Sequence, residues 1–141
     1  MPSATPADVL AYRRQLMLSG DADGLADLFA PDAVIEFSFH GPPGTPVRLE
    51  GRETIREYSR RVMASPLRLE DYEVTELYQS QDPEVVIAEM RAKATVTTTG
   101  RSITATSIQV LRIQDGHLAL FRDFADPRIF QDVTGDAGAG G

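Results

Sequence analysis

One carboxylate stands out in this sequence because of its neighbours. Asp123 lies in Ile108–Pro127, IQVLRIQDGHLALFRDFADP, on the second of two apolar runs that flank Asp115-Gly116. Because side chains alternate between the two faces of a strand, Asp123 should share a face with Phe121 and two alanines. An apolar lining disfavours the charged form of a carboxylate, which is one way to make a proton-transfer group that works near neutral pH.

Structural roles would also suit Asp123. The carboxylate could form a salt bridge at the strand edge, or lie at a rim in contact with water. Structural ion pairs perturb carboxylates too, so the spacing alone leaves the catalytic and the structural interpretations open.

Composition limits the classes of partner. The chain has 141 residues, enough for one domain with a real core, and a net charge of −7. Nucleic acids and anionic membranes need a basic footprint, so neither is expected as a partner. The start of the chain lacks a leader pattern and no stretch is long enough to span a bilayer, so we expect a cytoplasmic protein.

Metal chemistry is not expected. The sequence has no cysteine, which excludes disulfides and thiolate ligands. His40 and His117 fall in a loop and a turn, with no ligand spacing around them. We therefore expect chemistry without a metal or another cofactor.

Three helices are expected in the first half of the chain. The first begins at Thr5-Pro6 and runs to about residue 18, the second covers residues 21–30, and the third covers residues 51–64. Tyr12 should join Val9 and Leu16 on the apolar stripe of the first helix, and Tyr58 should lie on that of the third. Each tyrosine would bring a hydroxyl to an inward face.

The strands follow a period of two. They are expected over residues 33–39, 47–50, 69–78, 84–99 and 103–114, with a last strand after Asp115-Gly116, a pair typical of tight hairpins. In the strand at 84–99, apolar residues alternate with Glu89, Arg91 and Lys93, which indicates one dry face and one polar face. These charges favour a solvated or interface-facing ladder over a catalytic cluster.

This order of elements predicts an α+β fold, in which three helices cover the concave face of a curved antiparallel sheet. Such a sheet wraps a cavity, and polar groups on its inner face can meet there. A single domain should cover residues 1–134, followed by a disordered Gly/Ala tail at residues 135–141.

The residues resemble a known family. The resemblance rests on three segments: Gly51-Arg52-Glu53 at the start of the third helix, Asp82-Pro83-Glu84 before the long strand, and the closing Arg122-Asp123-Phe124 with Pro127. They look like the nuclear transport factor 2-like superfamily, and within it the SnoaL-like polyketide cyclases and phenazine-biosynthesis isomerase-like proteins. The resemblance covers roughly Val9 to Phe130 and implies a cone-shaped sheet, but this fold serves many reactions and also non-catalytic binders.

Carried over residue by residue, the resemblance supports Asp123, because the cyclases, epoxide hydrolases and phenazine proteins each place an acid there. Gln109 falls where the cyclases carry a histidine, and Tyr58 falls where the phenazine group does. The ketosteroid isomerase base falls at Phe37 and its tyrosine near Arg13, next to Tyr12. That mechanism therefore lacks its base.

The epoxide hydrolase pattern is also missing. Its four polar residues fall near Ile35, Phe37, Met90 and Ala92, all apolar here. What remains is an apolar pocket with few polar groups. The expected lining is Tyr12, Ile35, Phe37, Phe39, Met90, Ala92 and Phe121.

The leading functional hypothesis is a cofactor-independent cyclase or isomerase that acts on a hydrophobic, carbonyl-containing small molecule, within secondary metabolism. Asp123 would remove a proton next to the carbonyl, while Tyr58 or Gln109 stabilises the enolate. The alternative is a small-molecule-binding protein without turnover, since a base without a reliable second acid favours it.

The outer face of the sheet suggests a self-association surface. Ile108, Val110, Leu118 and Leu120 should make it too apolar to leave in water. We therefore expect a homodimer packed sheet to sheet, with the Glu89, Arg91 and Lys93 ladder nearby.

Overall fold

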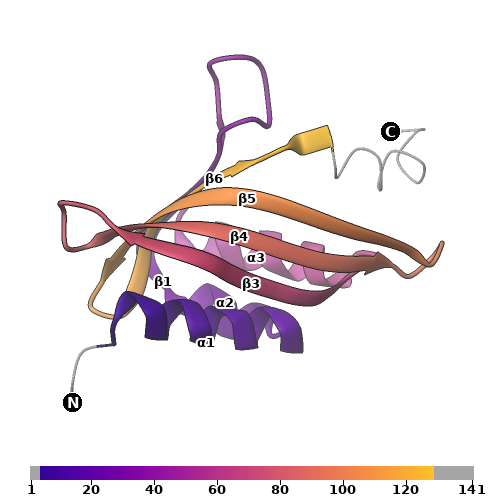
Figure 1. The fold of residues 1–141 in the computed structure, drawn as a ribbon, viewed down its shortest axis with the longest axis horizontal. Helices are drawn as coiled ribbons and strands as arrows, with labels where there is room; N and C mark the ends of the chain where they lie inside the picture. Colours follow the sequence, from indigo (N-terminus) through magenta and orange to yellow (C-terminus); the bar gives the residue numbers. More distant parts are fainter. Residues whose placement is uncertain (1–3, 129–141) are drawn as a thin grey trace.

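The structure is a computed structural model that describes residues 4–128, so the tail at 135–141 lies outside the described residues. Its elements are α1 Pro6–Ser19, α2 Ala22–Leu28, β1 Phe29–Phe37, β2 Val47–Glu50, α3 Arg52–Ala64, β3 Leu67–Gln79, β4 Val85–Val96, β5 Arg101–Gln114 and β6 His117–Ala125. The three helices lie on one face of a curved sheet (Figure 1). The predicted α+β class is confirmed.

The sheet has six strands in the order β2-β1-β6-β5-β4-β3, and it is mixed. β1 runs parallel to β6, while the other neighbouring pairs are antiparallel, so the expected all-antiparallel sheet was wrong at this one pair. The reason is that β1 follows α2 directly and pairs with β6, the last strand within residues 4–128. This arrangement brings Phe37 on β1 opposite Asp123 on β6, and Asp123 opposite Gln109 on β5.

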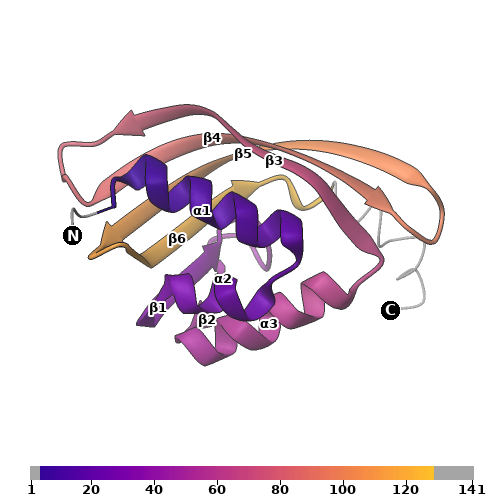
Figure 2. The same ribbon diagram turned by 90° about the horizontal axis from the view of Figure 1, so that it is seen from below.

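The helices cover different parts of the sheet. α1 packs against β3, whereas α3 packs against α2 and β1. Seen from the helical side, the long strands β3, β4 and β5 extend past the end of α1 (Figure 2). Among the described residues, 4–128, no helix is long and apolar enough to cross a membrane.

The hairpin between β5 and β6 has the predicted turn. Asp115 and Gly116 both have positive φ, 51° and 75°, as the tight turn requires. Leu118 pairs with Ile113 but Leu120 pairs with Arg112, so Ala119 is an extra residue in β6. Because this bulge turns Leu118 to the other face, Leu118 is 0% exposed, and its expected place on the outer face was wrong.

The buried face of α1 differs from the expected apolar stripe, since Arg13 is buried in place of Tyr12. Thr5 caps its start in a reciprocal pair with Asp8, as the sequence suggests. The buried residues are Val9, Leu10, Arg13 and Leu16, whereas Tyr12 is 50% exposed. The buried face is therefore centred on Leu10 and Arg13, and the prediction for Tyr12 was wrong.

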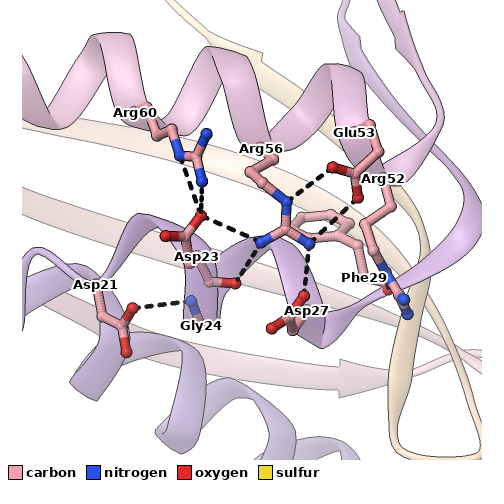
Figure 3. Close-up of polar contacts among 9 residues, drawn as sticks. All are labelled: Asp21, Asp23, Gly24, Asp27, Phe29, Arg52, Glu53, Arg56 and Arg60. Atoms are coloured by element: carbon pink, nitrogen blue, oxygen red, sulfur yellow. Dashed lines mark hydrogen bonds and ion pairs between the residues drawn. The ribbon is translucent and has the colours of Figure 1, made fainter.

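An arginine cluster fastens α3 to α2. Arg56 donates hydrogen bonds to Asp23, Asp27 and Glu53, and Arg60 also donates to Asp23 (Figure 3). These contacts raise the pKa of the Arg56 guanidinium, so its charge is permanent. The acidic partners Asp23, Asp27 and Glu53 are exposed although Arg56 is half-buried, so the cluster orients the two helices more than it adds stability.

Candidate active site

Asp123 occupies the middle of β6, on the inner face between Phe37 and Gln109. It is half-buried, and burial raises its pKa to about 6, although the Arg13 charge and a hydrogen bond with Ser107 oppose the shift. Its Oδ1 atom is buried and meets no hydrogen-bond partner within the described part of the chain. The carboxylate is thus partly desolvated, with Phe37 on the strand to one side and the polar Gln109 and Ser107 on the strand to the other.

Arg13 reaches the same inner face from α1. Its side chain is 2% exposed, and its Nη2 donates to the Gln109 Oε1 at 2.9 Å. The guanidinium carbon lies 5.0 Å from the centre of the Tyr72 ring and 5.3 Å from that of Phe121, so two aromatic faces hold the cation. Its Nε and Nη1 are buried without a hydrogen-bond partner among residues 4–128.

Gln109 is committed at both ends of its amide. Its Oε1 accepts from Arg13, and its Nε2 donates to the Tyr72 hydroxyl at 2.6 Å. The side chain is 1% exposed. Gln109 therefore holds Arg13 and Tyr72 in place, and the second N–H of its amide is the one donor left over from these two bonds.

Arg13 and Asp123 are close without bonding to each other. The Arg13 charge lowers the pKa of Asp123, yet Asp123 Oδ1 and the two Arg13 nitrogens have no hydrogen-bond partner in the described residues. Buried polar atoms left unsatisfied in a native fold call for a water, an ion or a ligand. Here they have opposite charges and flank the same side chains, Gln109 and Phe121.

Tyr58 approaches Asp123 from α3. Its ring centre lies 5.5 Å from that of Phe37, which is paired with Asp123 across the sheet. Burial and then the Asp123 charge raise the pKa of the Tyr58 hydroxyl, while Arg61 opposes them. The hydroxyl therefore stays protonated at neutral pH and can donate a hydrogen bond beside the carboxylate.

The expected lining residues divide into two groups. Ile35 and Met90 are buried in the core, and Phe37, Ala92 and Phe121 are half-buried and pack against it. Tyr12 and Phe39 lie elsewhere. β1 ends at Phe37 and the chain turns, so Phe39 is 57% exposed and its ring centre lies 5.8 Å from that of Phe124. Phe124 alternates with Asp123 along β6, so Phe39 packs on the outer face.

A groove of about 550 Å³ opens between α1 and β3. Of the expected site residues, Met90 borders it, together with Tyr72, which stacks on Arg13. The groove thus reaches Tyr72 and Met90, which contact Arg13, while Asp123 is not among its lining residues. The apolar pocket expected around Asp123 stays a prediction.

Sequence reasoning missed Arg13 and Tyr72. The signal for Arg13 was present, since it falls four residues after Val9 and three before Leu16, on one helical face. Within residues 4–128, no three His, Cys, Asp or Glu side chains gather where they could hold a metal ion.

The fold is that of a small α+β protein with helices on one face of a curved sheet, and its structural neighbours include isomerase-like and cyclase-like proteins. The chain belongs to the SnoaL-like domain family, whose model matches residues 9–121. The resemblance seen in the sequence is confirmed.

Three relatives illustrate the family. The chain is 37% identical over 120 residues to an uncharacterized PhzA/B-like protein of Pseudomonas aeruginosa, covering 85% of this chain and 83% of that protein. A solved structure from Bacillus subtilis, provisionally named an isomerase, is 28% identical with a TM-score of 0.82, covering 92% and 91% of the two chains. SalBIII, an epoxide hydrolase/cyclase-like enzyme of pyran ring formation in the polyether salinomycin, is 22% identical with a TM-score of 0.68, covering 85% and 89%.

Proposed function

We propose that this protein is a cofactor-independent acid–base enzyme of the cyclase or isomerase type. The observation that supports it best is Asp123, a carboxylate whose buried Oδ1 has no hydrogen-bond partner among the described residues. A structural carboxylate would use its buried oxygen in an ion pair or a hydrogen bond. An unsatisfied oxygen in an apolar lining suits a group that accepts a proton from a bound molecule.

The chemistry begins with proton transfer to Asp123. With a pKa of about 6, the carboxylate is ionised at neutral pH and still basic enough to take a proton from carbon next to a carbonyl. Tyr58 stays protonated beside it and donates to an oxygen of the substrate. Gln109, expected to share that role, also positions Arg13 and Tyr72 through the oxygen and one N–H of its amide.

The substrate class follows from the lining. Phe37, Phe121 and Ala92 are half-buried on the inner face and offer apolar contact, with few polar groups around them. This lining suits a flat, hydrophobic, carbonyl-containing molecule oriented by a few hydrogen bonds. The PhzA/B-like relative and the cyclase-like SalBIII favour a place in secondary metabolism.

The test is enolisation of a simple flat ketone, 2-tetralone, in D₂O. Exchange of its C1 protons, followed by NMR, should be faster with the wild-type protein than in buffer. Asp123→Asn should slow the catalysed exchange by about two orders of magnitude or more while tetralone still binds. Asp71→Asn is the matched control, because Asp71 is an exposed carboxylate paired with Arg14.

If tetralone binds but its C1 protons exchange at the rate seen in buffer, the proposal of an acid–base enzyme is contradicted. This result would favour the alternative, a small-molecule-binding protein without turnover. Equal exchange by wild type and Asp123→Asn would remove Asp123 from the mechanism.

A further inference from the structure

We propose that Arg13 is the oxygen-binding group of this site and that the site takes a neutral ketone or ester rather than a carboxylate. Arg13 would hold the carbonyl oxygen and stabilise the negative charge that forms on it. The inference deepens the proposed function, on which it rests for the role of Asp123.

The donors of Arg13 are already in place. Nε and Nη1 are buried and unpartnered among the described residues, while Nη2 is fixed by Gln109. Tyr72 and Phe121 hold the plane of the guanidinium. Donors that are fixed before the reaction stabilise a developing charge without having to reorganise.

Arg13 is also buried too deeply to be a surface cation. Burial of an unpaired charge is costly, so a buried arginine normally bonds a carboxylate. In the described part of the chain its hydrogen bonds go to a neutral amide and a thioether, Gln109 and Met90. Two donor nitrogens, Nε and Nη1, therefore remain for an oxygen that residues 4–128 do not supply.

The charge around the site indicates a neutral substrate. Within residues 4–128, the hydrogen bonds and ring contacts of Arg13 and the hydrogen bond of Asp123 go to uncharged side chains: Gln109, Met90, Tyr72, Phe121 and Ser107. With Asp123 ionised, one cation balances one anion. A carboxylate ligand would place a second anion beside Asp123 and disfavour the ionised base. A neutral carbonyl keeps the base ionised.

The step balances without a co-reactant. Asp123 takes the proton from the carbon next to the carbonyl, and the electron pair of the broken C–H bond moves to form the enolate. Asp123 becomes neutral as the oxygen beside Arg13 becomes negative, so the negative charge moves toward the cation. The enolate then recovers a proton from Asp123, giving an isomer. Alternatively, its carbon attacks a second carbonyl of the same molecule and closes a ring, and the alkoxide formed on that second carbonyl takes the proton back from Asp123.

The experiment uses 2-naphthol, whose naphtholate form resembles a flat enolate and is measured by absorbance. It is titrated on Asp123→Asn, which resembles the protonated base, and on the same protein carrying Arg13→Met. Arg14→Met in the Asp123→Asn background is the control, because Arg14 is the next arginine on α1 but is exposed and paired with Asp71. Affinities for 2-acetylnaphthalene and 2-naphthoate are compared on the wild-type protein.

On Asp123→Asn, the bound naphthol should ionise at a lower pH than in buffer. Arg13→Met should abolish that shift and weaken naphtholate binding by about tenfold or more, while Arg14→Met keeps the shift. The neutral ketone should bind wild type more tightly than the carboxylate does.

Three results would overturn the inference. Naphthol bound to Asp123→Asn that ionises no more readily than in buffer would show that no cation faces its oxygen, even if Arg13→Met does not fold. Unchanged ionisation of naphthol in a folded Arg13→Met variant would show that Arg13 is not the group that binds the oxygen. Tighter binding of 2-naphthoate than of 2-acetylnaphthalene would show that the site prefers a carboxylate to a neutral ketone. None of these readouts needs turnover, so they separate this inference from the tetralone test of the enzyme.

Discussion

Arg13 on α1 and Gln109 on β5 are joined by a buried hydrogen bond of 2.9 Å between positions 96 residues apart in the chain. The bond ties the first helix to the centre of the sheet, and Tyr72 on β3 extends it through the Gln109 amide. Because Gln109 is paired with Asp123 on the neighbouring strand, the same contact places a cation beside the carboxylate. The protein thus fixes its two charged inner-face groups relative to each other without pairing them.

Gln109→Glu should raise the pKa of Asp123 above that of the wild type. The new carboxylate would lie next to Asp123 across the sheet, and it would also engage the Arg13 charge that now favours ionisation. A pH titration of the Asp123 carboxyl carbon by NMR measures the change. Gln114→Glu, at the exposed end of β5, should leave the titration unchanged, and an equal or lower pKa in Gln109→Glu would contradict this geometry.

Asp123→Asn should be more stable than wild type at neutral pH. The folded pKa of about 6 lies above the unfolded value of roughly 4. Ionisation therefore costs the folded state, and the cost appears as pH rises through the unfolded pKa and is complete above about 6. It amounts to roughly 3 kcal/mol at most.

The measurement is urea unfolding at neutral pH and near pH 4, where the gain of Asp123→Asn should shrink. Asp71→Asn should instead lower stability at neutral pH, and this loss should shrink near pH 4. The reason is that the hydrogen bond from Arg14 lowers the pKa of Asp71, so ionised Asp71 stabilises the folded state. A destabilised Asp123→Asn at neutral pH would mean that Asp123 is a paired structural carboxylate.

The inner face of β6 could be predicted from the sequence, but Arg13 was not. Alternation puts the side chains of Asp123 and Phe121 on the same face of β6 whatever the register of that strand, because both residues follow the bulge at Ala119. The buried face of α1 is harder to predict, because Tyr12 and Arg13 are adjacent. Hydrophobicity favours burial of the tyrosine rather than of the arginine. The structure reverses this choice because Gln109 and two aromatic rings provide partners for the guanidinium.

Phe37→Asp should lower stability at neutral pH. Phe37 packs against Tyr58 and His40 and lies opposite Asp123, so the new carboxylate would lose apolar contacts and face a like charge. The loss should recover partly as pH falls, because the raised pKa of the new carboxyl lets it protonate. A thermal melt at the wild-type temperature at neutral pH would show that Phe37 makes no buried contact.

We also expect a homodimer through the outer face of the sheet. Ile108 is exposed there, with Val110, Leu120 and Phe124 half-buried around it. Leu118 is not part of this face, because the bulge at Ala119 buries it, a device that the sequence pattern does not reveal.

Light scattering at micromolar concentration should show a dimer, and Ile108→Lys should shift it to a monomer. Val62→Lys is the control, since Val62 is an exposed apolar residue on α3, away from the sheet's outer face. A monomeric wild-type protein would count against the interface.

The central claim is that Asp123 is a proton-transfer group, and its own titration tests this most directly. The carboxyl carbon of Asp123, assigned by comparison with Asp123→Asn, is followed by NMR as pH is varied. We predict a midpoint near 6, because burial in the apolar inner face outweighs the Arg13 charge and the Ser107 hydrogen bond. A midpoint at or below the ordinary aspartate value of roughly 4 would contradict the account, because it would mark Asp123 as a paired or solvated carboxylate.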